Sequence, residues 1–208
     1  LSDDDTMWSN PTEAIKQIEI QYGDVLPKPN VQWQETTSDK TMSLLAFQGI
    51  GSHRLEHVKD DPDAAYIDDF SWMVAFPVRE GFERYGACAF FDHNRQLVRI
   101  YTAYNDKTHY PSDKTWEAAK WCWRCALFAG VTVADHLGSV RYLASNLLVT
   151  ATREQLPPEH PFRRLLTPFI YGTADVNRDA FVLLSPMQGF SHRTFAFTYD
   201  GIVRCLLK

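Results

Sequence analysis

The sequence predicts a mainly α-helical fold around one long central helix, with a small β-hairpin near the start of that helix. Residues 116–156 contain no proline and only two glycines, Gly130 and Gly138, which predicts one helix of about 40 residues, roughly 60 Å long. Residues 85–91 and 97–104 are rich in β-forming side chains on either side of a turn-forming run, as in a hairpin. The chain has 208 residues, 45% of them hydrophobic, which is enough for one domain with a buried core.

Before the hairpin, the sequence predicts one short helix and two surface loops. Residues 12–22 have the apolar spacing of a short helix, which prolines then end. Residues 34–43 and 57–64 are polar and charged, so we expect surface loops there. Asp113 or Thr115 is placed to cap the long helix.

The long helix should lie among other helices, because residues 126–134 are apolar on nearly every side. Pro157–Pro158 ends it. Two shorter helices are expected next, one with Pro161 in its first turn and one over residues 175–184. Residues 190–208 are aromatic and are predicted to be extended.

Charge and hydropathy exclude several classes of protein. A net charge of −5 disfavours a nucleic-acid partner, and no run of eighteen apolar residues predicts an integral membrane segment. Residues 1–5 lack the basic and apolar regions of a secretory signal, so we expect a cytoplasmic location.

The spacing of Cys122 and Cys125 matches the C-x-x-C motif of redox and zinc sites. This pair lies inside the predicted long helix, without a second pair or a neighbouring histidine. We therefore favour reduced, buried thiols for these residues and for Cys88 and Cys205.

The second half of the chain carries three motifs in order. They are Leu97–Ile100 with Trp116-x-x-Ala119-Lys120; Arg153–Pro157 with His160-Pro161 and Leu165-Leu166; and Thr173-x-x-Val176-Asn177-x-x-Ala180. Together they resemble the catalytic domain of lipoxygenases, the non-haem iron dioxygenases of polyunsaturated fatty acids. The resemblance is strongest over residues 97–181, and it implies that residues 1–208 form a single truncated lipoxygenase-like catalytic domain with a helical core.

The resemblance also implies an iron site, which can be compared with the residues present. In the family, the core helix supplies two histidine ligands five residues apart, and a π-type bulge turns both toward the metal. The first position falls on His136 and the second on Arg141, whose guanidinium has no lone pair to donate. Further ligands come from segments after the position of Asn177, and this chain continues only to Lys208. We therefore expect no cofactor in this chain alone, and iron only if another polypeptide completes the site.

The candidate site residues follow from these positions. His136 and Arg141 are the candidate catalytic residues, and His136 is the single retained metal-ligand position. Arg141, Thr132 and Ser145 are the candidate substrate-binding residues, with Ser145 at the position of a family glutamate. Alternatively, His136 is a core histidine bonded to Thr132 or to a backbone carbonyl, and Arg141 pairs with Asp135 or another acid.

Three functions remain open. In the first, the chain acts on or binds a polyunsaturated fatty-acid or polyene-type substrate without iron-dependent dioxygenation, through cyclase- or isomerase-type chemistry in the vacated metal pocket. Alternatively, it is a non-catalytic structural or interaction module derived from a lipoxygenase, or a fragment of an active iron lipoxygenase. The expected partner is a hydrophobic small molecule or lipid, and homo- or hetero-oligomers are compatible with all three. Whether the chain is an enzyme stays open.

Overall fold

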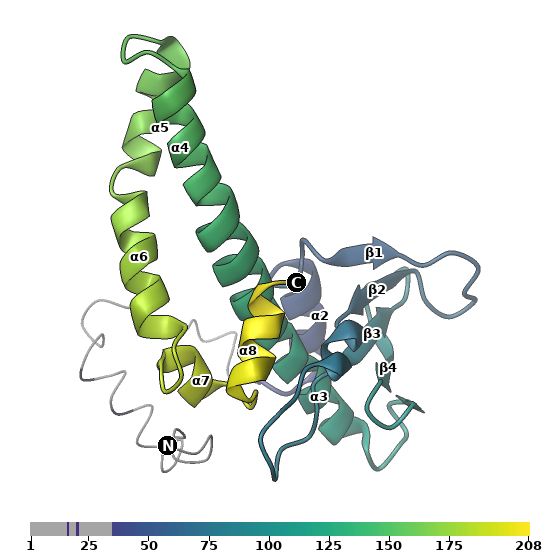
Figure 1. Cartoon of the computed structure of the whole chain (residues 1–208). Helices are drawn as coiled ribbons and strands as arrows, with labels where there is room; N and C mark the ends of the chain where they lie inside the picture. Colours follow the sequence, from purple (N-terminus) through teal and green to yellow (C-terminus); the bar gives the residue numbers. More distant parts are fainter. Residues whose placement is uncertain (1–15, 17–19, 21–34) are drawn as a thin grey trace.

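The computed structural model describes Lys16, Ile20 and residues 35–208. The helix predicted over residues 12–22 lies almost entirely outside them. Figure 1 shows two regions, which we call the base and the stalk. The base holds the β-sheet and the helices around it. The stalk is a helical hairpin, α4 to α6, that projects from the base.

The described helices, two of which are not α-helices, are α2 (Asp39–Phe47), the 3₁₀ helix η3 (Ser71–Ala75), α3 (Trp116–Ala129), the π-helix η4 (Gly130–Ala144), α4 (Ser145–Gln155), α5 (Pro161–Ile170), α6 (Thr173–Leu184), α7 (Phe190–Thr194) and α8 (Tyr199–Leu206). The described strands are β1 (Leu55–His57), β2 (Tyr66–Asp69), β3 (Ala87–Phe91), β4 (Leu97–Thr102) and β5 (Lys107–His109). The prediction of a mainly helical fold is therefore confirmed.

The sheet is antiparallel throughout, with its strands in chain order from β1 to β5. The predicted hairpin is the β3–β4 pair, in which Ala89 faces Ile100. The sheet is nevertheless larger than a hairpin, because β1, β2 and β5 extend it on both sides. The loop expected over residues 34–43 is also wrong in part, since α2 begins at Asp39. Ser38 caps this helix by accepting a 3.2 Å hydrogen bond from the backbone N–H of Thr41.

The core of the base lies between α3 and the sheet. Trp123 of α3 is fully buried, and its ring lies 6.1 Å from that of Phe91 on β3, in an edge-to-face arrangement. Lys120, from the W-x-x-A-K motif, is buried one turn earlier on the same helix. Its ammonium donates to Asp39 at 2.8 Å and to the backbone oxygen of Thr37 at 2.7 Å, so it fastens α3 to the start of α2.

The predicted long helix is confirmed, since α3, η4 and α4 follow one another without a break. Gly130 and Ser145, at the two junctions, both keep right-handed helical backbone angles. The middle of this helix is a π-helix. At its end, the N–H of Ser145 donates to the carbonyl of Val140, five residues back.

Residues 190–208 are not extended as predicted, because α7 and α8 form there. Thr198 caps α8 by accepting from the N–H of Gly201 at 3.1 Å, and Ile202 and Cys205 within this helix are fully buried. The prediction relied on the aromatic residues of this segment and overlooked its helical spacing. Helix α8 lies against η4, where an added Cβ on Gly138 would meet the backbone oxygen of Leu206 at 2.4 Å.

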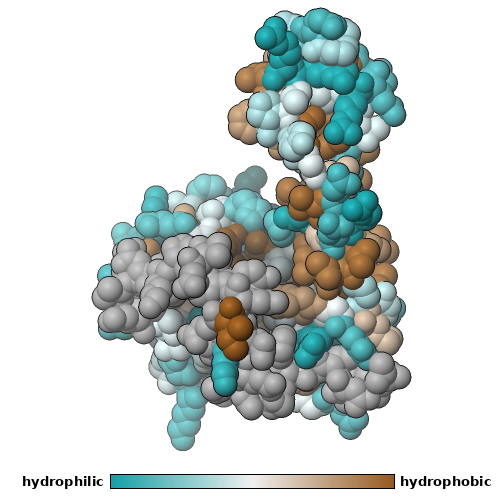
Figure 2. Space-filling view, turned by 90° about the vertical axis from the view of Figure 1, so that its left-hand side faces the viewer, coloured by the Kyte–Doolittle hydropathy of each residue, from teal (hydrophilic) through white to brown (hydrophobic). Residues whose placement is uncertain are grey.

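In the stalk, α5 and α6 run back along α4 toward the base (Figure 1). Both shorter helices are confirmed, with Pro161 in the first turn of α5 and α6 starting at Thr173. Figure 2 shows hydrophobic surface on this projection. Leu147, Leu165 and Phe169 are each more than half exposed. Among the described helices, none combines the length and apolar character that crossing a bilayer requires.

Candidate functional site

The π-helix η4 carries most of the predicted site residues. His136 and Arg141 are five residues apart, and hydrogen bonds from i to i+5 bring residues at this spacing onto neighbouring turns of one face. His136 is exposed, so it is not the buried core histidine of the alternative interpretation, and it forms no hydrogen bond with Thr132. Arg141 and Thr132 are half-buried. Their roles in catalysis and binding stay predictions.

Asp135 does not pair with Arg141. Its carboxylate receives two hydrogen bonds from Arg54, and Nε2 of His53 lies 2.9 Å from its Oδ2. Burial opposes ionisation of Asp135, but these hydrogen bonds hold its pKa below the usual value. The guanidinium of Arg54 also lies over the ring of Phe70, 5.5 Å from its centroid. This cluster ties the π-helix to the loop before β1.

Asp68 is a buried carboxylate beside that cluster. It is completely inaccessible to solvent, and neither carboxylate oxygen has a hydrogen-bond partner among the described residues. Burial raises the pKa of Asp68 to about 7, and the nearby charges of Asp69 and Asp135 add to this effect while Arg54 opposes it. Asp68 lies on β2, and its side chain is enclosed in the core of the base.

Asn177 joins the stalk to the end of the π-helix. Its buried amide nitrogen lies 2.7 Å from the carbonyl oxygen of Arg141, and 2.9 Å from both Ser145 Oγ and Asn146 Oδ1. Ser145 in turn donates to the same Arg141 carbonyl at 2.5 Å. The hydroxyl of Ser145, a predicted substrate contact, is therefore engaged in holding α6 against η4.

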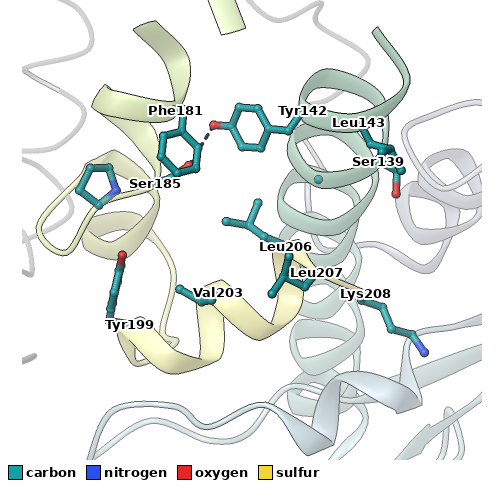
Figure 3. Close-up of a pocket in the computed structure, with 12 residues that line it drawn as sticks. Ser139, Tyr142, Leu143, Phe181, Ser185, Tyr199, Val203, Leu206, Leu207 and Lys208 are labelled. Atoms are coloured by element: carbon teal, nitrogen blue, oxygen red, sulfur yellow. Dashed lines mark hydrogen bonds between the residues drawn. The ribbon is translucent and has the colours of Figure 1, made fainter. Parts of the chain in front are cut away.

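A cavity of about 650 Å³ lies between η4, α6 and α8 (Figure 3). Its lining is mainly apolar and includes Gly138, Tyr142, Leu143, Phe181, Val203 and Leu206. This volume falls within the range of about 300–1,000 Å³ that small-molecule sites occupy. His136, Arg141, Thr132 and Ser145 are not among its lining residues. The structure thus brings the predicted residues onto one helix but places the cavity beside other residues of that helix.

The sequence interpretation missed the cavity residues. Val203 and Leu206 were missed because residues 190–208 were expected to be extended. The signal was present, since Thr198 precedes a run in which Ile202, Cys205 and Leu206 have helical spacing. Tyr142 and Ser185 carried no recognisable motif, and only the fold brings them together.

The cysteines form no disulfide and remain free thiols. Cys88 and Cys205 are buried as predicted, but Cys122 is only half-buried and Cys125 is exposed. Burial raises the pKa of Cys122 to about 11, which disfavours the thiolate that redox chemistry and zinc binding require. Within the described part of the chain, no three His, Cys, Asp or Glu side chains gather in a way that could hold a metal ion.

Comparisons with known proteins bear on the fold of this chain. No family model matches the chain, and no curated protein matches it. Among solved structures, the 9R-lipoxygenase from Cyanothece PCC8801 superposes with a TM-score of 0.72 and 19% identity, over 93% of this chain and 31% of that one. The chain has a lipoxygenase-like fold.

A second lipoxygenase structure superposes less well. It is a structure of the manganese lipoxygenase of Gaeumannomyces graminis, solved with part of zonadhesin of Komagataella pastoris, with a TM-score of 0.50 and 16% identity over 86% of this chain and 30% of that one. The chain thus spans about a third of the length of the lipoxygenase structures it matches.

The lipoxygenase-like fold implies iron in the full enzyme, which sets the requirements that residues of this chain would have to meet. Iron needs several neutral imidazoles and carboxylates around one point. On the π-helix, a guanidinium without a lone pair follows His136 at the five-residue spacing. The described residues therefore do not fit an iron site.

Proposed function

We propose that this chain is a lipoxygenase-like protein that binds a polyunsaturated fatty-acyl or polyene chain in the cavity beside the π-helix. The observation that carries the proposal is the cavity itself, whose mainly apolar lining comes from η4, α6 and α8. Removing an apolar chain from water into such a lining is favourable by about 25 cal/mol per Å² of buried apolar surface. The lipoxygenase-like fold supports this choice of ligand class.

We further propose that any reaction on the bound chain proceeds without iron-dependent dioxygenation by this polypeptide alone. Isomerisation or cyclisation needs groups that move a proton, and His136 is the candidate acid or base because its exposed ring can exchange protons with water. Arg141 is the candidate that stabilises negative charge on the substrate. Both residues need a bound chain to reach beyond the cavity, since neither lines it.

Binding is tested by displacement of a fluorescent fatty-acid probe from the purified chain by a C18 diene. Val203→Trp places a large ring in the cavity and should weaken binding at least tenfold. Val176→Trp is the matched control, because Val176 is exposed on α6 outside the cavity and should leave the affinity within twofold. Equal affinity in all three proteins, or no displacement in the parent, would refute the proposal.

Turnover is tested by chromatography of the same diene after incubation with the protein, with metal content measured on the same sample. We expect an isomeric product that His136→Ala abolishes while probe binding persists. Stoichiometric iron together with oxygenated product would instead identify the chain as an active dioxygenase.

A second candidate is favoured by the exposed apolar side chains of the stalk. The chain spans about a third of the matched lipoxygenases, and large apolar residues such as Leu165 and Phe169 face solvent on α5. A module that packs against further helices, whether as an interaction partner or as part of an iron lipoxygenase, would cover them. Two results together would favour this candidate. Amide hydrogen exchange would be slow in α4 to α6, and the chain would bind no diene.

A further inference from the structure

Two hydroxyl groups meet at the cavity. Tyr142 Oη, from the π-helix, lies 2.9 Å from Ser185 Oγ, at the end of α6 (Figure 3). Ser185 is buried, with 5% of its surface exposed. The ring of Phe181 packs edge-on against that of Tyr142, with centroids 5.5 Å apart. This packing fixes the orientation of the tyrosine.

The pair has a hydrogen-bond donor to spare. Each hydroxyl has one hydrogen and two lone pairs, and their mutual hydrogen bond uses only one of the two hydrogens. Neither oxygen makes a further side-chain hydrogen bond within the described part of the chain. One O–H therefore remains to donate to an oxygen of a ligand in this mainly apolar cavity, where an unmade hydrogen bond is costly.

The charge around the cavity restricts the ligand further. Lys208 is the charged residue among the described lining residues, and Figure 3 shows its side chain directed away from Tyr142 and Ser185. Its Nζ lies 5.6 Å from the centroid of the Trp72 ring, outside the cavity. A carboxylate beside the two hydroxyls would thus be buried without a cation, which is unfavourable.

We infer that the Tyr142–Ser185 pair selects an apolar chain that carries a neutral oxygen, such as an alcohol, ketone or ester, over a free carboxylate or a plain hydrocarbon. This inference rests on the proposed function, because it assigns the polar end of the same ligand. The bound oxygen accepts the spare O–H, and the rest of the chain contacts the apolar lining from Leu143, Val203 and Leu206.

Three C18 probes with the same two double bonds test the inference at pH 8: linoleyl alcohol, ionised linoleic acid and an octadecadiene. The parent should bind the alcohol about three- to tenfold more tightly than the hydrocarbon, as one net hydrogen bond predicts. It should bind the acid more weakly than the alcohol.

The variant Tyr142→Phe/Ser185→Ala removes both hydroxyls and should bind the alcohol and hydrocarbon equally, with the hydrocarbon affinity within twofold of the parent. Ser139→Ala is the control, because Ser139 also lines the cavity but points away from the pair in Figure 3. Thermal unfolding by circular dichroism establishes that each variant is folded.

The outcomes separate this inference from the proposal on which it rests. Equal binding of alcohol and hydrocarbon by the parent, a preference that survives in the double variant, or tighter binding of the acid would each overturn the inference and leave chain binding intact. Failure of all three probes to bind would overturn both.

Discussion

The base and the stalk differ in the solvent exposure of their large side chains. In the base, Trp123, Phe91 and Phe70 are completely buried between α3 and the sheet. In the stalk, Leu165 and Phe169 are 61% and 78% exposed. The base thus supplies its own core, whereas the stalk buries few side chains, among them Val149, Ile170 and Asn177. The lipoxygenase-like fold is therefore most completely packed where the chain folds back on itself through the sheet.

The largest effect should come from truncating the core of the base. Trp123→Ala removes a fully buried side chain and should lower the free energy of unfolding by about 3–5 kcal/mol, as large-to-small core substitutions do. Trp121→Ala is the matched control on the same helix, because Trp121 is 50% exposed and should cost less than about 1 kcal/mol. Urea unfolding measures both. Similar losses in the two variants would show that the base is no better packed than a surface.

A second prediction uses the buried carboxylate of Asp68. Its folded pKa of about 7 lies above the ordinary value of 3.8, so the folded state holds this proton more tightly than the unfolded state. The stabilisation is complete below about pH 4 and is lost as the pH rises through about 7, by on the order of 4 kcal/mol. Urea unfolding at a series of pH values measures it.

Asp68→Asn should remove that slope, because an amide does not titrate in this range. Asp63→Asn is the control, since Asp63 lies exposed in the loop before β2 and should leave the slope unchanged. A slope that persists in Asp68→Asn would assign the pH dependence to another group.

A smaller effect is expected where the stalk joins the base. Asn177→Ala removes the amide that reaches Arg141, Ser145 and Asn146, and should cost about 1–2 kcal/mol. Hydrogen exchange should become faster in α6 while α3 keeps its protection. Arg178→Ala, at the exposed neighbouring position, should change neither. Uniform acceleration in both helices would mean that stalk and base open together.

Sequence reasoning reached the long helix, the β3–β4 hairpin, α5 and α6, because proline, glycine and turn residues mark their ends locally. It identified Asn177 only as part of a motif, and the structure adds its contacts with the Arg141 carbonyl and Ser145. It missed α8, and with α8 the cavity. Tyr142 and Ser185 are 43 positions apart, and no local pattern states that they meet. Such contacts depend on how three helices pack, which a single sequence does not display.

The smallest expected effect concerns the apolar surface of the stalk. Leu147 is 61% exposed on α4, so Leu147→Glu should change the free energy of unfolding by less than about 0.5 kcal/mol. Thr150→Glu, at an exposed polar position on the same helix, controls for the added charge. Sedimentation should show less self-association for Leu147→Glu than for the control, because a charge disrupts an apolar contact surface. A loss above about 2 kcal/mol would instead mean that Leu147 is covered in solution, and the stalk would then resemble the base.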